Sequence, residues 1–511
     1  MAQSVVKQIP LWDLKHGLFA DRSPHEIPPG GCESCSNLLY VDGKIRPRPG
    51  FVEAYPTASV QAVHHVSQWT PSVGSPLLIR ADRGGSNESH IYYYSSGWVS
   101  AAAAFSNATT SALVPTSANF KGFWYYAPGE YDLIEFDGST AYTVDSVQAT
   151  TAFQPPNDPR FVAANDSRLF LADVLDDSAV RVPYRVCWSD FLNARVWNGG
   201  VGAGSSGFQD LAGDSYPITG LYTLNEMILV FKRNATYVGR FVGGRKTYEF
   251  RPLYRGIGCI AHATIRELEN GALIWLGDDA VYYAFPGQQP QSIGEAIHNR
   301  LRSLCSLTEL HKASAIYDRA THFYHLFLPE SGTTRQCIIL SVNLKDYGWW
   351  EGRIASSGSF LNPLDTHELK TNWGSQMLAG CEDAKIYEFS FSNTSDAGQA
   401  FTTSWVSGLF SVLPITNSQA EQTMVHSLRA FADAGNVTLA VLRGDGIDRF
   451  TETSFGTQTF DGTSSTMKNT RTDSAEHFKV KMTHATISTA AKVQGLQIGL
   501  RFMGNTRGTK T

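Results

Sequence analysis

The chain has 511 residues, of which 17% are charged and 12% are aromatic, and its formal net charge is -5. This length exceeds what one hydrophobic core usually supports, so we expect two or three domains. The mild negative charge argues against a broadly basic surface that wraps nucleic acid. Low charge together with 45 Gly and 22 Pro favours many short strands over long amphipathic helices.

The cysteine count and the first residues bear on the cellular compartment. Seven cysteines, scattered along the chain, do not resemble the framework of a disulfide-rich secreted domain, so we expect them to be reduced. The opening MAQSVVKQIPLWDLKHG lacks the basic and apolar regions of a signal peptide, and no stretch approaches 18 apolar residues. The sequence therefore predicts a chain that is made in the cytoplasm and is not inserted into a membrane.

Residues 1–55 are predicted to form an extended, Pro-rich arm. The runs PHEIPPGG and KIRPRPGF disfavour helix. Because an extended segment cannot bury itself, we expect it to lie along another domain or a neighbouring subunit. Cys32 and Cys35 in this arm lack a second Cys pair at zinc spacing, so we interpret them as two small residues in a turn.

Residues 56–394 repeat an apolar strand, a polar or Gly turn, and a second strand that carries Tyr or Phe. The copies begin at Pro76, Phe123, Arg168, Met227, Ala272, His322 and Met377, about 45 to 60 residues apart. Radially stacked blades of a β-propeller cover each other's faces, and seven copies would be enough to close a ring. An ordinary sandwich or several unrelated β domains would also give short strands, but the regular spacing favours a propeller.

Three further segments complete the prediction of an all-β chain. The run GGVGAGSSGFQDLAGD, residues 199–214, is predicted to be a long flexible loop between blades. Apolar residues at helical spacing after Ser292 predict a short helix that decorates the ring. Residues 395–511 alternate apolar and polar positions, which predicts a C-terminal β-sandwich that ends in a mobile tail.

Several groups contain residue types found in catalytic or metal-binding sites, but none has the spacing that such a site requires. The pairs are His64 with His65, His322 with His325, Asp176 with Asp177, and Asp278 with Asp279. Neighbours in a strand point to opposite faces, and adjacent Asp residues in a turn do not face each other across a cleft. The aromatic runs at Tyr92–Tyr94, Trp124–Tyr126 and Trp349–Trp350 have the surfaces to stack on sugars or bases, but we expect most of them to fill the space between blades. We therefore predict no catalytic, cofactor-binding or metal-binding residues.

The opening PLWDLKHGLFADRSPHEIPPGGCESCSNLLYVDGKIRPRPGF resembles the start of tail proteins from tailed bacteriophages. The matching positions are Pro29, Gly30, Asn37, Gly43, Arg46, Arg48, Pro49 and Gly50. The runs CWSDFLNARVWN from Cys187, PITGLYTLNEMILVFKRNATYVG from Pro217, RGIGCIAHATI from Arg255 and ALIWLGDDAVYYAFPG from Ala272 follow in order. Together they resemble the β-propeller tail nozzle proteins of short-tailed phages, over residues 8 to 300. Asp278, Asp279 and Ala280 depart from the Gly-rich turn expected at their positions.

The resemblance implies a structural virion protein and not an enzyme. It implies a homo-oligomeric ring of six subunits, assembled in the host cytoplasm, that docks beneath the portal and adaptor protein and contacts tail fibres or spikes. The ring would retain the packaged DNA, contact it transiently in the lumen and guide its ejection. A carbohydrate-binding or carbohydrate-degrading propeller tail protein for host attachment is the alternative, and an unrelated cellular propeller scaffold is a third hypothesis.

Overall fold

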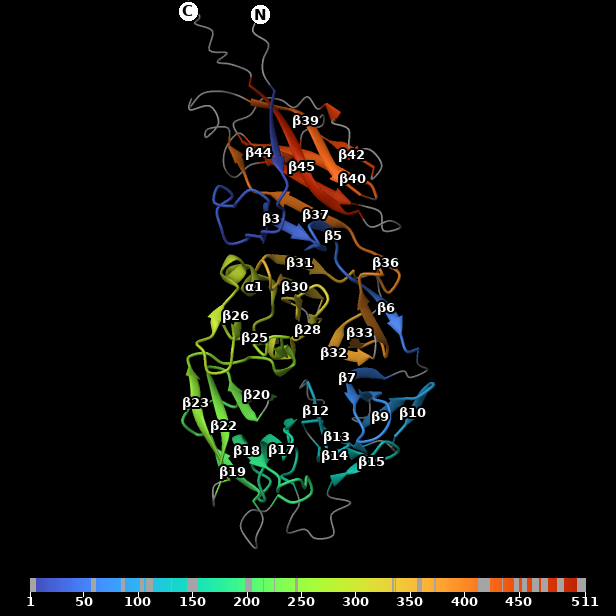
Figure 1. The fold of residues 1–511 in the computed structure, drawn as a ribbon, viewed down its shortest axis with the longest axis vertical. Helices are drawn as coiled ribbons and strands as arrows, with labels where there is room; N and C mark the ends of the chain where they lie inside the picture. The colour runs from blue at the N-terminus through green and yellow to red at the C-terminus, as the bar shows by residue number, and fades with distance from the viewer. Residues whose placement is uncertain are drawn as a thin grey trace, which may run out of the picture.

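The structure is a computed structural model in which nearly every element is a β-strand. It describes residues 6–502 except 57–60, 84–87, 102–104, 107–113, 130, 145–154, 198–204, 215, 225, 244–246, 333–334, 336, 356–360, 372–373, 412–422, 434, 445–449, 453–456, 462–467, 470–476 and 485–490. Within these residues, no helix combines the length and the apolar character needed to cross a membrane. Figure 1 shows a ring of small sheets with a second β domain at one end.

The ring is a β-propeller, in which the described residues form seven four-stranded antiparallel blades. Blade one contains β7 (Ala62–Trp69), β8 (Leu77–Arg83), β9 (Glu88–Tyr94) and β10 (Trp98–Ser100), with β11 (Phe105–Ser106) paired to β9. Blade two contains β12 (Thr116–Phe120), β13 (Phe123–Ala127), β14 (Ile134–Phe136) and β15 (Ala141–Thr143). Blade three contains β16 (Phe161–Ala164), β17 (Leu169–Leu175), β18 (Arg181–Trp188) and β19 (Gly207–Asp210).

The remaining four blades follow in chain order. Blade four contains β20 (Ile218–Leu224), β21 (Met227–Lys232), β22 (Ala235–Gly243) and β23 (Thr247–Arg255). Blade five contains β24 (Arg266–Glu267), β25 (Leu273–Leu276), β26 (Val281–Ala284) and β27 (Gln291–Ser292), after the 3-10 helix η4 (His262–Thr264). Blade six contains β28 (Ser314–Asp318), β29 (Phe323–Leu328), β30 (Ile338–Asn343) and β31 (Trp349–Arg353). Blade seven contains β32 (Pro363–Thr371), β33 (Gly374–Cys381), β34 (Ile386–Ser390) and, from the N-terminal segment, β6 (Gly50–Ala54).

Strand composition follows from the burial of both faces of a blade. Every residue of β28, β29 and β30 is buried, and these strands read SAIYD, FYHLFL and IILSVN. A sheet that is covered on both faces by its neighbours needs continuous apolar runs instead of simple alternation. The prediction of a propeller is confirmed, and the physical reason for its aromatic, β-branched strands is this stacking of blades.

The prediction of a loop over residues 199–214 is wrong for residues 207–210. These form β19, the outer strand of blade three, which pairs antiparallel with β18. The Gln209 side chain also bridges to blade four, where it accepts a hydrogen bond from Phe250 N at 2.9 Å and donates one to Phe250 O at 3.0 Å. A short edge strand with polar residues carries little hydrophobic signal, which is why its sequence resembles a loop.

The N-terminal segment closes the ring. Strand β6 pairs antiparallel with β34 and supplies the fourth strand of blade seven. Phe51 of β6 is fully buried, with its ring centroid 4.8 Å from that of Phe389 and 6.1 Å from that of Phe327. The first and last parts of the propeller are therefore held in one sheet, which leaves blade seven without an open edge at β34.

The C-terminal domain is a β-sandwich that includes strands from the N-terminal segment. One sheet contains β43 (Lys468–Asn469), β39 (Thr423–Ala432), β45 (Val493–Phe502), β5 (Lys44–Pro47) and β4 (Leu38–Val41), with β1 (Val6–Leu11) also paired to β45. The other contains β3 (Gly31–Ser36), β37 (Thr403–Ser407), β44 (His477–His484), β40 (Val437–Gly444) and β41 (Phe450–Glu452), with β38 (Phe410–Ser411) and β42 (Gln458–Phe460) at its margins. The segment expected to lie along another domain thus pairs with this chain's own C-terminal domain.

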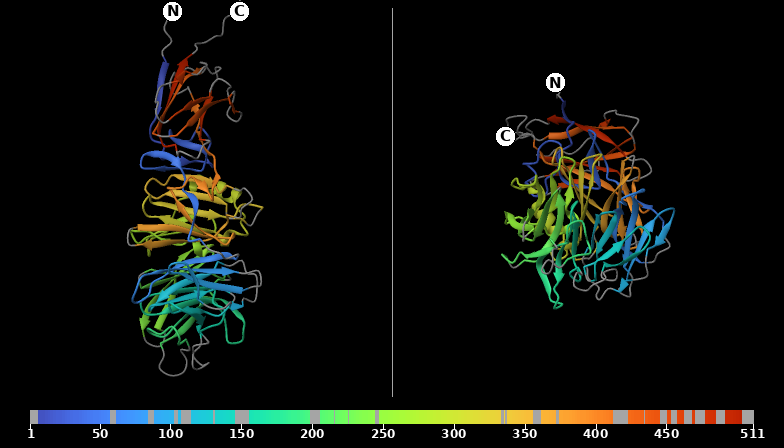
Figure 2. Two further views of the ribbon diagram at one scale, coloured as in Figure 1. Left: turned by 90° about the vertical axis from the view of Figure 1, so that its right-hand side faces the viewer. Right: turned by 60° about the horizontal axis from the view of Figure 1, so that its bottom comes forward.

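Strand pairing crosses both predicted domain boundaries, at residues 55 and 394. Strand β2 (Gly17–Leu18) runs parallel to β31 of blade six and to β3 of the sandwich, so one twelve-stranded sheet continues from the propeller into the sandwich. The short strands β35 (Ser395–Asp396) and β36 (Gln399–Ala400) extend blade seven. Figure 2 shows the blue N-terminal strands between the propeller and the orange and red sandwich.

The predicted helix after Ser292 is present and lies between blades five and six. It consists of η5 (Glu295–Ile297) and α1 (His298–Leu304), and η6 (Leu310–Lys312) follows. The carboxylate of Asp21 accepts hydrogen bonds from the backbone N–H groups of Asn299 and Arg300 at 2.5 and 3.1 Å. An N-terminal residue therefore satisfies donors that the first turn of α1 leaves unpaired.

Candidate functional site

A buried arginine joins the N-terminal segment, the propeller and residues 395–402, which lead from blade seven to the C-terminal sandwich and are called the C-terminal linker below. Arg48 is 2% exposed, and its guanidinium donates two hydrogen bonds to the Asp396 carboxylate, at 2.6 and 3.0 Å. It also donates to Asn37 Oδ1 at 2.9 Å and to the Arg353 carbonyl of β31 at 2.8 Å. The Phe401 ring lies 4.1 Å from the guanidinium. We call these residues the Arg48 junction.

Asn37 completes the Arg48 junction through both ends of its side-chain amide. Its Oδ1 also accepts from the backbone N–H of Arg353 at 2.8 Å, while its Nδ2 donates to the Thr402 carbonyl at 2.9 Å. The amide therefore contacts the propeller and the C-terminal linker together. Its backbone φ of 57° lies in the left-handed region, which Asn tolerates better than most residues.

At two glycines of the N-terminal segment, the backbone of another segment approaches so closely that a side chain would overlap it. Gly30 has a φ of 86°, and a Cβ there would overlap the Asp13 carbonyl. A Cβ at Gly50 would overlap the backbone of Ser395, which lies directly beside β6. Asn37, Arg48 and Gly50, identified by resemblance, thus have structural roles at one place.

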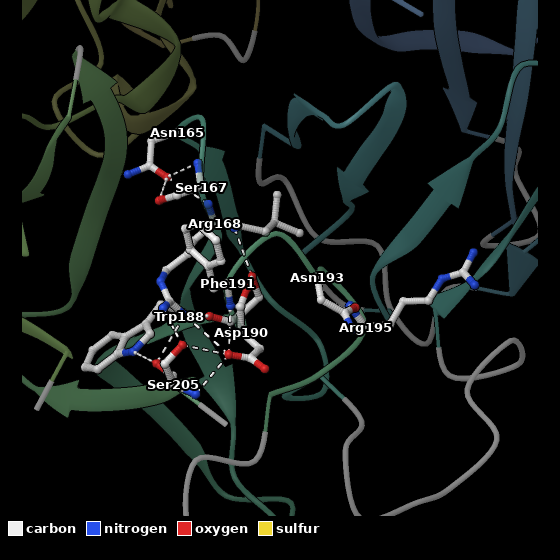
Figure 3. Close-up of polar contacts among 11 residues, drawn as sticks. Asn165, Ser167, Arg168, Trp188, Asp190, Phe191, Asn193, Arg195 and Ser205 are labelled. Atoms are coloured by element: carbon white, nitrogen blue, oxygen red, sulfur yellow. Dashed lines mark hydrogen bonds and ion pairs between the residues drawn. The ribbon is translucent and has the colours of Figure 1, made fainter. Parts of the chain in front are cut away.

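The run CWSDFLNARVWN leaves β18 and connects blade three to its neighbours. Arg168 is 2% exposed and donates hydrogen bonds to the carbonyls of Ser189 and Ser205 and to Ser205 Oγ. The Asp190 carboxylate accepts from Ser205 N at 2.8 Å and from Ser205 Oγ at 2.7 Å. Trp188 Nε1 donates to the Ser205 carbonyl at 3.1 Å (Figure 3). We call this group the Arg168 network.

The same run pairs with blade two. Arg195 points away from the Arg168 network in Figure 3, and its guanidinium binds the fully buried Glu135 carboxylate at 2.5 and 3.3 Å. Tyr125 donates to the same carboxylate at 2.8 Å. A buried carboxylate of this kind is tolerated because it is paired and hydrogen-bonded. The run therefore ties blades two and three together.

A pocket of about 800 Å³ opens beside the Arg168 network, between blades three and four. Asn165, Arg168 and Phe191 line one side, and Phe241 and Tyr248 of the β22–β23 hairpin line the other. Asn165 Nδ2 donates to the Tyr248 hydroxyl at 3.3 Å, which joins the two sides. In Figure 1, these blades lie at the end of the molecule opposite the C-terminal sandwich.

A second polar group lies where the inner strands of blades seven, one and two meet. His65 Nε2 is 2.8 Å from Ser117 Oγ, and His65 Nδ1 is 2.8 Å from Asp365 Oδ2. This is the residue order of a Ser–His–Asp triad, and both contacts measure 2.8 Å. The three residues belong to blades one, two and seven, so the group also ties together the inner strands of neighbouring blades. Sequence inspection missed it because the three residues come from distant strands.

The Asp365 carboxyl remains ionised in this buried position. Burial by itself raises its pKa, but the charge and contact of His65 and the N–H of Val66, which donates at 3.1 Å, lower the pKa below its ordinary value. Asp365 Oδ1 also accepts from Thr366 N at 2.8 Å. The interaction with His65, together with the hydrogen bonds, outweighs the cost of removing the charged carboxylate from water.

The other candidate pairs from the sequence do not converge on a site. His325 is buried in blade six, where Nδ1 lies 2.8 Å from Ser341 Oγ, whereas His322 sits in the preceding turn. Asp176 accepts from the N–H groups of Ser178 and Val180, as a turn residue does. Among the described residues, no group of three or more His, Cys, Asp or Glu side chains is arranged to hold a metal ion.

The remaining candidates are parts of the core. Cys32 and Cys35 are buried in β3 and not in a turn, and all seven cysteines are free. Burial raises the pKa of Cys32 well above its ordinary value, which makes a thiolate unfavourable. The runs Trp124–Tyr126 and Trp349–Trp350 are buried, which confirms that they fill space between blades. Tyr92–Tyr94 are half-buried in β9.

Acid is expected to destabilise the fold through His325. Burial lowers the pKa of His325 to about 4, so between pH 6.5 and 4 the unfolded chain binds a proton that the folded chain does not. Stability is therefore complete above pH 6.5 and falls as the pH drops toward 4, by up to about 3 kcal/mol for this group. Urea unfolding at pH 7 and pH 4.5 measures the loss.

Variants separate His325 from the other titrating groups. His325→Asn, which keeps a partner for Ser341, is expected to reduce the difference in unfolding free energy between the two pH values. His311 is exposed, so His311→Asn serves as the control and should leave the difference unchanged. An unaltered pH dependence in His325→Asn would show that another group is responsible.

No protein-family profile matches the sequence, and no curated relative matches it. An extracellular domain from Bacteroides thetaiotaomicron is similar in structure at 12% identity and a TM-score of 0.42, over 83% of this chain. This chain spans 48% of that domain's length. The WD40 propeller of Doa1 is similar at 6% identity and a TM-score of 0.37, over 67% of this chain and 96% of that one. A fungal alcohol oxidase, solved in complex with copper, is similar at 12% identity and a TM-score of 0.40, over 84% and 92%.

Proposed function

We propose that the chain is a structural subunit of the tail nozzle of a short-tailed bacteriophage, which retains packaged DNA and guides its ejection. The observation that carries the proposal is the Arg48 junction. Asn37, Arg48 and Gly50, which belong to the phage-like opening, bind the N-terminal segment to the propeller and to the C-terminal linker. A subunit that bears load during DNA retention needs such a permanent connection between its domains.

The continuous twelve-stranded sheet supports the same proposal. Propeller and sandwich share backbone hydrogen bonds through β2 and β31, and β6 closes blade seven. Relative domain motion is the usual expectation for domains joined only by a linker, but a shared sheet opposes it. The expected partners are further copies of this chain in a hexameric ring, the adaptor protein, tail fibres or spikes, and DNA in the lumen of the virion tail.

Electron microscopy of the purified full-length protein tests this proposal. We expect closed rings with a central channel at high protein concentration, because head-to-tail interfaces that close by rotation give rings. In phage particles that contain the protein, a labelled antibody should bind the distal end of the tail. Monomers at all concentrations, together with no label on the tail, would show that the chain is not a nozzle subunit.

A carbohydrate-binding tail protein remains the second candidate. The observation that favours it is the pocket between blades three and four, with exposed aromatic rings at its walls. The pocket is compatible with a nozzle subunit that also contacts a glycan, so the two functions do not exclude each other.

A further inference from the structure

The pocket between blades three and four has the dimensions of a small-ligand site. Its volume of about 800 Å³ falls within the roughly 300 to 1,000 Å³ range of such pockets. Its described lining comes from four parts of the chain: the β16–β17 turn at Asn165–Arg168, the segment after β18 at Phe191, the β20–β21 turn at Glu226, and the β22–β23 hairpin at Phe241. A concave site of this kind suits a compact ligand better than the flat face of a protein partner.

The wall formed by the Arg168 network is held by hydrogen bonds within the protein. Asn165 Oδ1 accepts from the N–H groups of Ser167 and Arg168 at 3.0 and 2.8 Å, which fixes the β16–β17 turn. The Arg168 guanidinium is occupied by Ser189 and Ser205, with Asp190 at 4.0 Å. Because three hydrogen bonds hold it against Ser189 and Ser205 and its charge lies near the Asp190 carboxylate, we treat Arg168 as a group that supplies shape and not as an anion site.

Two phenylalanines present their rings to solvent at the pocket. Phe241 is 66% exposed and Phe191 is 60% exposed. The Phe241 ring is supported edge-on by the buried Tyr248 at 5.7 Å, and Tyr248 in turn packs on Trp188 at 5.7 Å. The exposed Phe241 ring, held in place by this buried aromatic column, forms a preorganised stacking surface.

The rim carries groups that suit hydroxyls more than phosphates. Asp166, Glu226 and Arg240 are exposed and line the pocket, so two carboxylates accompany one guanidinium. Carboxylates accept hydrogen bonds from hydroxyl groups, and a guanidinium donates to hydroxyl oxygens. A nucleic-acid site needs an excess of positive charge for the phosphates, which this rim does not offer.

We propose that this pocket binds a neutral saccharide, whose C–H face stacks on Phe241 or Phe191 while the rim residues bind its hydroxyls. The site lies on blades far from the C-terminal sandwich and leaves the Arg48 junction untouched. The inference does not rest on the nozzle assignment, because ring formation and glycan binding are measured independently.

Labelled full-length protein on an array of purified neutral oligosaccharides, followed by calorimetry with the strongest binder, tests the site. We expect Phe241→Ala and Phe191→Ala each to weaken binding about tenfold or more, since an aromatic anchor carries much of the energy of such a site. Both side chains are largely exposed, so the variants should keep the wild-type melting temperature.

Phe208 provides a matched control on blade three. It is 59% exposed on β19 and does not line the pocket, so Phe208→Ala should bind within about twofold of the wild type. A single-stranded oligonucleotide serves as the competitor and should not displace the sugar. The proposal is overturned if no oligosaccharide binds, if both pocket variants bind as the wild type does, or if the oligonucleotide binds more tightly in a Phe241-dependent way.

Discussion

Asp396→Ala is expected to lower the free energy of unfolding by about 3 to 5 kcal/mol, because it leaves the buried Arg48 guanidinium without a counter-ion. Both side chains of the pair are almost completely buried, at 2% and 0% exposure. Asp396 Oδ2 also accepts from the backbone N–H of Ala355 at 2.8 Å, and that donor would lose its partner. Urea unfolding at pH 7 measures the change.

The control for this variant is an exposed ion pair in the same blade. Lys385 pairs with Glu53 through a side chain that is 42% exposed, so Lys385→Ala should cost at most about 1 kcal/mol. Replacing both buried partners, as Arg48→Met with Asp396→Leu, should recover part of the loss, because no isolated charge remains. Equal effects of Asp396→Ala and Lys385→Ala would contradict the role of the Arg48 junction.

Phe51→Ala is expected to destabilise the protein by about 3 to 5 kcal/mol through a cavity at the closure of the ring. The Phe51 ring is fully buried and packs against Phe327 of blade six and Phe389 of blade seven. Its loss weakens the contact that holds β6 on β34. Hydrogen exchange of the β34 amides should accelerate together with the loss of global stability.

Val52, the next residue of the same strand, separates side-chain packing from backbone pairing. Its side chain is 41% exposed, so Val52→Ala removes little buried surface and should change stability by less than about 0.5 kcal/mol. If Val52→Ala were as damaging as Phe51→Ala, the effect would come from strand propensity and not from the buried ring.

The local sequence was sufficient to predict the buried strands of the blades. Runs such as FYHLFL at β29 and IILSVN at β30 predict buried strands without any knowledge of the partner, because their composition already meets the needs of a sheet covered on both faces. β19 shows the limit: GFQD has no apolar pattern, and it is a strand because β18 offers a free edge. Edge strands depend on a partner, which sequence does not display.

The long-range contacts of the N-terminal segment also could not be predicted from the local sequence. Its prolines correctly indicate an absence of helix, and the resemblance singled out Asn37, Arg48 and Gly50. The contact between Arg48 and Asp396, which are 348 residues apart, forms only when the chain folds back and β6 enters blade seven. The local sequence therefore does not predict it. The His65, Ser117 and Asp365 group is likewise assembled from three blades.

The sequence by itself determined the all-β propeller, its approximate repeat and the C-terminal sandwich, because periodicity and burial act within each short strand. Only the tertiary structure decided which strand closes the ring, that propeller and sandwich share one sheet, and where Phe191 and Phe241 form a pocket. These features depend on pairings between residues far apart in the chain, whose geometry follows from the packing of whole blades and leaves no local pattern.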